Sequence, residues 1–154
     1  MQPIRLPDVA ATEELATQIA TALPLDCSGW MLLLAGELGA GKSTLARSML
    51  RAMGHDGVVP SPTYTLVEPY ELQSGTVYHI DLYRISSIED LDFLGWNDLR
   101  DGLILLEWPE RVPELQAQAD LLVSLSYDGF GRTATVQALS GRAGALLDRI
   151  IIVN

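Results

Sequence analysis

Cysteine, long apolar runs and positive charge are all scarce in this chain of 154 residues, and each shortage excludes a class of protein. The single cysteine, Cys27, cannot form an internal disulfide, so the sequence implies no oxidising compartment. The longest apolar runs, at 30–35 and 150–153, are far shorter than the roughly 20 residues that span a bilayer. Residues 1–8 show no secretory signal, so we expect a soluble cytoplasmic protein without membrane association.

Basic residues are outnumbered, with 10 Lys and Arg against 20 Asp and Glu, and the formal net charge is −10. An acidic surface repels phosphate backbones, so unaided tight binding to DNA or RNA is not expected. Hydrophobic residues make up 48% of the chain, which is enough for a packed core and argues against disorder. The length suits one compact domain, and we expect a single domain over residues 1–154.

Apolar periodicity predicts alternating helices and strands. Thr12 is suited to cap the first helix, and a capping box of Ser86 and Glu89 is suited to begin the third. We expect helices at 12–23, 42–53, 86–94 and 143–151, and strands at 30–35, 63–70, 76–81, 103–106, 121–127 and 133–139. Two of the strand pairs read as hairpins, which supply antiparallel neighbours. This order predicts an α/β fold whose central sheet mixes parallel and antiparallel strands and is flanked by helices.

A glycine-rich loop between the first expected strand and the second helix fits the Walker A pattern G-x-x-x-x-G-K-[ST]. Its glycines let the backbone turn sharply and approach phosphates, and its N–H groups converge on the anion. In this pattern Lys42 places its charge on the β- and γ-phosphates, Ser43 ligates Mg²⁺, and Thr44 adds a hydroxyl near the α-phosphate. The fold is therefore expected to be P-loop NTPase-like. The predicted nucleotide-binding segment comprises Glu37, Leu38, Gly39, Ala40, Gly41, Lys42, Ser43 and Thr44.

Two carboxylates stand at the ends of expected strands, Asp81 after 77–80 and Glu107 after 103–106. If these strands are parallel neighbours, both acids lie at the sheet edge where the P-loop also lies. Either acid could bind Mg²⁺ directly, bind it through water, or orient the attacking water. Each taken alone is also compatible with a solvated acid at a strand end.

Two other classes of triphosphate-using protein fit the sequence less well. GTPases specify guanine with N-K-x-D, and neither of the two asparagines here, Asn97 and Asn154, begins that motif. A small-molecule kinase usually brings several arginines over the phosphates from a lid. Arg84, Arg100 and Arg111 are too scattered to indicate such a lid.

Four segments, taken in this order, resemble the TsaE (formerly YjeE) family of P-loop ATPases of bacterial tRNA threonylcarbamoyladenosine synthesis. They are GELGAGKST at 36–44, SPTYTLV at 61–67, HIDLYR at 79–84 and LEWPE at 106–110. The resemblance implies a mixed-sheet P-loop fold and a Mg²⁺-dependent ATPase, slow alone, that acts on a TsaB–TsaD complex and meets tRNA only indirectly. In that family the protein supports the enzyme that places threonylcarbamoyl on adenosine 37 of tRNAs reading codons that start with A. Partners that hold the RNA would suit an acidic chain.

Carried over by position, the resemblance implies that Lys42 and the loop bind phosphates and Ser43 ligates Mg²⁺. It implies that Asp81 and Glu107 complete the metal and water site. Thr63 looks like a switch-type threonine whose hydroxyl senses the γ-phosphate, and the alternative is a threonine that merely starts a strand. The predicted catalytic set is therefore Lys42, Asp81, Glu107 and Thr63.

Four further positions bear on the resemblance. Thr12 and Arg132 resemble positions near the nucleotide in the family. Trp108 could stack on a partner, brace the site or belong to the core, and His79 suits a structural histidine better than a catalytic base. The family often has Gly where Ala16 stands. Two alternatives to the ATPase stay open: a nucleotide-gated binding module with incidental hydrolysis, and a small-molecule kinase.

Overall fold

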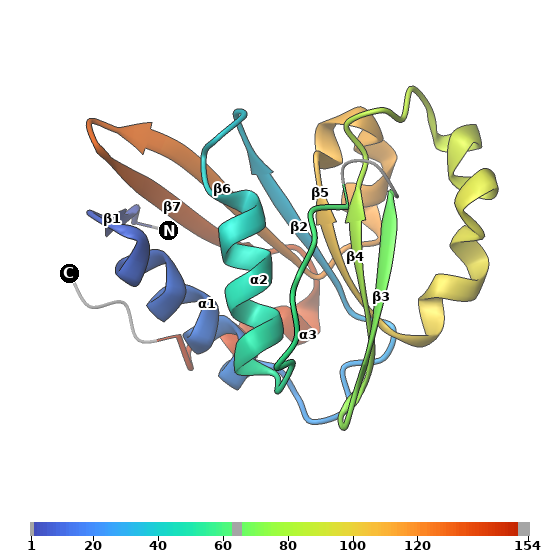
Figure 1. Ribbon diagram of the computed structural model, residues 1–154, viewed down its shortest axis with the longest axis horizontal. Helices are drawn as coiled ribbons and strands as arrows, with labels where there is room; N and C mark the ends of the chain where they lie inside the picture. Colours follow the sequence, from blue (N-terminus) through green and yellow to red (C-terminus); the bar gives the residue numbers. More distant parts are fainter. Residues whose placement is uncertain (1, 63–65, 151–154) are drawn as a thin grey trace.

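A mixed sheet in the strand order β1-β7-β6-β2-β5-β4-β3 forms the middle of the molecule in the computed structural model, which describes residues 2–62 and 66–150 (Figure 1). The central strands β6, β2, β5 and β4 run parallel to one another, whereas β7 pairs antiparallel with β6, β3 with β4, and β1 with β7. The prediction of an α/β fold with a mixed sheet is confirmed. The strands are β1 (Ile4–Leu6), β2 (Met31–Gly36), β3 (Val67–Leu72), β4 (Gly75–Asp81), β5 (Leu103–Glu107), β6 (Leu121–Asp128) and β7 (Gly131–Ala138).

Helices cover both faces of this sheet (Figure 1). The helices are α1 (Val9–Ala22), α2 (Lys42–Ala52) and α3 (Gly141–Leu147), with four 3₁₀ segments η1 (Ile88–Leu94), η2 (Trp96–Asp101), η3 (Pro109–Arg111) and η4 (Pro113–Ala117). Strand β2 is buried on both sides, because Leu32 and Leu34 pack with the α-helices while Met31 and Leu33 pack with the 3₁₀ segments. A strand covered on both faces reads as a continuous apolar run, as this one does. Across the described residues, none of the helices has the length and apolar character that crossing a membrane requires.

The first helix begins earlier than the sequence pattern predicted. Its N-cap is Asp8, whose carboxylate accepts the N–H of Ala11 at 2.9 Å. Thr12 is buried within the first turns of the helix, so its prediction as the cap was wrong. Asp and Thr are both good N-cap residues, so residue type does not choose between Asp8 and Thr12. The apolar spacing does not choose either, because Thr12 lies on the buried face of the helix.

Three other boundaries differ from the prediction. The capping residues of the third helical segment are Ser87 and Asp90, one place later than expected, because the Asp90 carboxylate accepts the N–H groups of Ser86 and Ser87. That segment forms η1, a 3₁₀ helix. The C-terminal helix ends at Leu147 instead of continuing to residue 151. Strand β3 begins at Val67, whereas its predicted start at Thr63 lies outside the described residues.

Candidate nucleotide and metal site

The loop between β2 and α2 turns on glycines in the left-handed region of backbone space. The φ angles are +150° at Gly36, +78° at Gly39 and +108° at Gly41. A Cβ at Gly36 would lie 2.6 Å from the carbonyl oxygen of Leu125, and one at Gly39 would lie 2.5 Å from the hydroxyl oxygen of Tyr127. A side chain at Gly36 would therefore meet fixed backbone, whereas one at Gly39 would displace the end of the Tyr127 side chain, and the positive φ favours glycine at both positions. The loop leads directly into the N-terminus of α2, where helix N–H groups favour an anion.

The side chain of Lys42 folds back over this loop. Its ammonium donates to the carbonyl oxygens of Gly36 at 2.5 Å and Glu37 at 2.9 Å, and it lies 4.0 Å from the centroid of the Trp108 ring. Burial lowers the pKa of Lys42, although nearby carboxylates, Glu107 foremost, act in the opposite direction. The ammonium is thus fixed beside the loop by contacts that a phosphate oxygen can replace.

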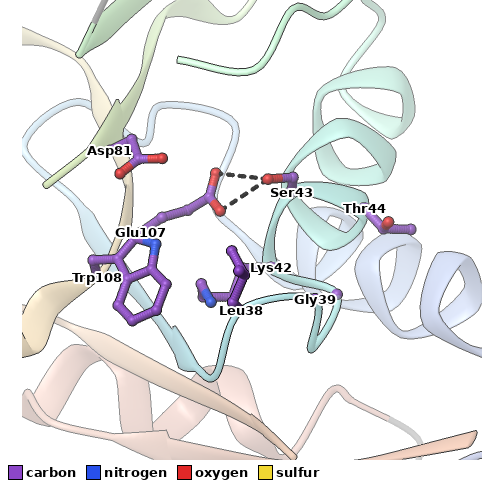
Figure 2. A pocket seen from close by; sticks show the side chains of 9 residues that line it. Leu38, Gly39, Lys42, Ser43, Thr44, Asp81, Glu107 and Trp108 are labelled. Atoms are coloured by element: carbon purple, nitrogen blue, oxygen red, sulfur yellow. Dashed lines mark hydrogen bonds between the residues drawn. The ribbon is translucent and has the colours of Figure 1, made fainter. Parts of the chain in front are cut away.

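Asp81 and Glu107 lie side by side because β4 and β5 are parallel and pair these two residues in register. Both are buried, and the hydroxyl of Ser43, in the first turn of α2, donates to Oε1 of Glu107 at 3.0 Å (Figure 2). Asp81 accepts the backbone N–H of Tyr83 at 2.8 Å. The sequence predicts that the two acids lie close together if their strands are parallel neighbours, and β4 and β5 are such neighbours.

These side chains surround one cavity, and a second cavity lies next to it along the P-loop. The first has a volume of about 190 Å³ and is lined by Leu38, Gly39, Gly41, Lys42, Ser43, Thr44, Asp81, Glu107 and Trp108 (Figure 2). The second, of about 370 Å³, shares Gly39, Gly41 and Thr44 with the first and is also lined by Thr12 and Arg132. Thr12 and Arg132 come from α1 and β7, so the fold brings two distant predicted residues to one cavity beside the loop.

The oxygen atoms at the first cavity suit a hard divalent cation. A serine hydroxyl at the start of the P-loop helix with one or two nearby carboxylates is the protein ligand set that Mg²⁺ takes in P-loop proteins. Ser43, Asp81 and Glu107 supply these groups. No group of three or more His, Cys, Asp and Glu side chains is arranged to hold a metal anywhere in the described ranges. Phosphate and water oxygens would therefore have to complete the coordination.

The hairpin of β6 and β7 braces the P-loop, and the sequence did not reveal this contact. The Tyr127 hydroxyl donates to the carbonyl oxygen of Leu38 at 2.7 Å, and Arg132 donates to that of Gly39 at 3.1 Å. The Arg132 guanidinium also lies 4.3 Å from the centroid of the Tyr127 ring. Tyr127 and Arg132 are paired across the hairpin. Alternation puts Tyr127 on the same face of β6 as the buried Val123 and Leu125, and no local pattern shows that its hydroxyl reaches the P-loop.

Two residues whose roles the sequence left open are Trp108, which lines the first cavity, and His79, which contacts the cavity residue Glu107 from behind. His79, which fitted a structural histidine, is fully buried with its Nε2 atom 2.6 Å from Oε2 of Glu107. Trp108 lines the cavity with a φ of +61°, and its ring centroid lies 5.0 Å from that of Tyr83. The ring of Trp108 therefore braces the site. Thr63, the predicted switch residue, lies outside the described residues.

Comparisons with known proteins agree with this geometry. The family described as threonylcarbamoyl adenosine biosynthesis protein TsaE matches residues 6–139. A protein of Haemophilus influenzae named tRNA threonylcarbamoyladenosine biosynthesis protein TsaE is 48% identical over 99 residues, which cover 63% of each chain. The chain thus spans just under two thirds of that relative's length. A Synechocystis protein with the same name is 40% identical over 119 residues, 73% of each chain.

The fold also matches a solved structure. The crystal structure of YdiB from Bacillus subtilis superposes with a TM-score of 0.75 over 97% of this chain and 93% of that one. The two sequences are 24% identical, so this likeness establishes the shared architecture alone.

Proposed function

The chain belongs to the TsaE family, and from this premise we propose that it is a Mg²⁺-dependent ATPase required for forming threonylcarbamoyladenosine at position 37 of tRNA. It would act in the cytoplasm, as a single domain, on a TsaB–TsaD complex that itself holds the tRNA. The observation that carries the proposal is the convergence of Ser43, Asp81 and Glu107 beside the P-loop lysine. The names of the relatives support the pathway, and the acidic composition supports an indirect relation to RNA.

The two neighbouring cavities suggest how ATP would lie. The phosphates would occupy the first cavity, where the loop N–H groups and the Lys42 ammonium provide positive charge. The nucleoside would occupy the second cavity, between Thr12 and Arg132. Thr44 lines both cavities, at the junction where the α-phosphate would join the two parts.

The residues of the first cavity divide the work of hydrolysis. Lys42 would exchange its contacts with the loop carbonyls for phosphate oxygens and so neutralise charge on the departing group. Ser43 and one of the two carboxylates, Asp81 or Glu107, would hold Mg²⁺ directly, and the ion would supply charge neutralisation on the β- and γ-phosphates when bound. The carboxylate not engaged with the ion would orient a water for attack on the γ-phosphorus. The bond from that phosphorus to the bridging oxygen breaks, and ADP and phosphate leave.

Phosphate release from Mg·ATP, measured with and without the TsaB–TsaD complex of the same organism, tests the proposal. We expect slow release from the chain alone and at least tenfold faster release with the complex, a reduction of the barrier by about 1.4 kcal/mol or more. Lys42→Ala should abolish both rates. Arg51→Ala is the matched control, because it removes an exposed cation from the other end of α2 and should change neither rate.

Three results would each replace the proposal. Absence of stimulation by a complex known to be functional would remove the partner-dependent mechanism. Normal tRNA modification by Glu107→Gln, in a protein that binds ATP without hydrolysing it, would instead indicate a nucleotide-gated binding module. An added small molecule that becomes phosphorylated would indicate a kinase.

A further inference from the structure

We propose that His79 is a positioning residue whose buried ring holds the Glu107 carboxylate in one orientation, facing Ser43 and the first cavity. This inference rests on the role in ion and water binding proposed above for Glu107. His79 is not part of the P-loop motif, and from the sequence alone it fitted a structural histidine.

The position of His79 follows from strand alternation and register. Residues 77, 79 and 81 of β4 point to the face of the sheet that α2 covers, because side chains two residues apart in a strand share a face. Asp81 pairs with Glu107 and His79 pairs with Leu105, so His79 lies two pairs back from the strand end. From there its ring reaches diagonally to Glu107, and the Nε2 atom lies 2.6 Å from Oε2.

The hydrogen of this bond belongs to the histidine. An ionised carboxylate only accepts hydrogen bonds, so Nε2 of His79 must be the donor to Glu107. The other ring nitrogen, Nδ1, is buried and has no hydrogen-bond partner within 2–62 and 66–150. Nε2 is therefore the ring atom that connects His79 to the site, and its N–H is directed at Glu107.

This bond fixes the carboxylate in one direction. Oε2 of Glu107 is held by His79 at 2.6 Å, while Oε1 is the nearer oxygen to the Ser43 hydroxyl, at 3.0 Å. A glutamate side chain released from His79 would regain rotational freedom, which must be lost again whenever the carboxylate binds an ion or orients a water. Partners that orient a ligating carboxylate typically change metal affinity or activity 10–100-fold when removed.

Three variants separate positioning from packing. His79→Phe keeps an aromatic ring of similar size but removes the donor, whereas His79→Gln returns an N–H donor on a chain of comparable reach. Ile80→Val is the packing control, since Ile80 is equally buried on the same strand but faces the 3₁₀ layer. Thermal melts establish that each variant is folded before the kinetic comparison.

In the phosphate-release assay with TsaB–TsaD, His79→Phe should keep the KM for ATP within about threefold while kcat falls about 10–100-fold. His79→Gln should recover most of the lost kcat, and Ile80→Val should resemble the wild type. Wild-type kcat in folded His79→Phe, or no recovery in folded His79→Gln, would overturn the inference while leaving the ATPase proposal intact. A wild-type protein that fails to hydrolyse ATP would overturn the proposed function itself.

Nuclear magnetic resonance of the free protein gives a readout that does not depend on activity. The chain has only two histidines, His55 and His79, so their ring nitrogen signals can be assigned with His79→Phe. We expect a hydrogen on Nε2 of His79, and we expect Glu107→Gln to shift that Nε2 signal without moving the signals of the half-buried His55. A hydrogen on Nδ1 alone, or no response to Glu107→Gln, would overturn the inference.

Discussion

Ser43 shows how much of this site depends on a single oxygen atom. Its hydroxyl donates to Glu107 from the first turn of α2, and it lines the cavity that also contains Asp81. The P-loop pattern accepts serine or threonine at this position, and both residue types carry a hydroxyl on the β-carbon. A requirement for that oxygen, rather than for the size of the side chain, explains why either residue suits a Mg²⁺ ligand.

We predict that Ser43→Ala weakens binding of a non-hydrolysable ATP analogue at least tenfold in Mg²⁺, a loss of about 1.4 kcal/mol or more of binding free energy. In EDTA the affinity should change little, because only the contact with the ion is lost. Ser43→Thr should bind within about threefold of the wild type in both buffers, a difference below 1 kcal/mol. Titration calorimetry measures these affinities. An equal loss in EDTA would show that the hydroxyl supports the loop itself and not the ion.

The residues that could be read from the sequence are those in contiguous motifs. Lys42 and Ser43 follow from the Walker A spacing because the loop and the helix start are local structures. The contact of His79 with Glu107 depends on the parallel register of β4 and β5, which no local pattern specifies. The Trp108 ring approaches Lys42 only because Trp108 adopts a left-handed backbone conformation, which is uncommon for a bulky residue.

At the scale of elements, the β6–β7 hairpin and the P-loop form one unit. Tyr127 and Arg132 bond two successive carbonyls of the loop, at Leu38 and Gly39. A Cβ at Gly39 would meet the Tyr127 hydroxyl at 2.5 Å but the ring carbon that bears it only at 3.8 Å, an ordinary contact. The steric barrier at Gly39 is therefore due to the hydroxyl oxygen, and backbone strain is a separate cost.

A double-mutant cycle measures the two costs. We predict that Gly39→Ala weakens nucleotide binding more in the wild-type background than in Tyr127→Phe, with a coupling of about 0.5–3 kcal/mol between contacting residues. In Tyr127→Phe, Gly39→Ala should still lower the free energy of unfolding by about 1–2 kcal/mol in a urea melt, the strain of a left-handed non-glycine residue. Fluorescent-nucleotide titrations of the four proteins give the coupling.

Gly129→Ala is the control for this cycle. Gly129 also has a positive φ, +60°, but a Cβ there meets nothing within 4 Å. Its substitution should lower stability by about 1–2 kcal/mol through strain alone and leave nucleotide affinity unchanged. If the effects of Gly39→Ala and Tyr127→Phe are strictly additive, the hairpin does not hold the loop in its binding conformation.

The elements themselves were predictable where periodicity was long and buried. Strands β2 and β5 and helix α2 were expected from apolar runs and spacing, and each is found within about a residue of its predicted place. Strand β1 was not expected, because three residues are too few to show alternation. The 3₁₀ segments after β5 are held by contacts with the sheet and carry no helical period of their own.

At the scale of the whole molecule, one buried acid joins three elements at the end of the sheet opposite the P-loop. Asp120, directly before β6, accepts the backbone N–H of Met31 at the start of β2, at 3.0 Å. It also accepts the hydroxyl of Ser140 at 2.7 Å and the guanidinium of Arg142 at 2.7 and 2.8 Å, both at the start of α3. The guanidinium lies 4.4 Å from the centroid of the Trp30 ring. This junction fixes α3 against the central strands.

The charge of Asp120 should make this junction pH-dependent. Burial alone raises the pKa of Asp120, but its hydrogen bonds, those from Arg142 foremost, outweigh burial and lower it below 3.8. A pKa that is lower in the folded than in the unfolded protein adds stability at pH values above the unfolded pKa, and this stability is lost as pH falls through the folded pKa.

We predict that Asp120→Asn reduces the free energy of unfolding at pH 7 by about 2 kcal/mol. This loss of stability should shrink as the pH falls below 3.8. Urea melts at several pH values measure the free energy of unfolding. Asp128→Asn is the control and should change this free energy little, because Asp128 lies 3.9 Å from Arg5 in an exposed ion pair. A deficit constant with pH would attribute the effect to packing instead of charge.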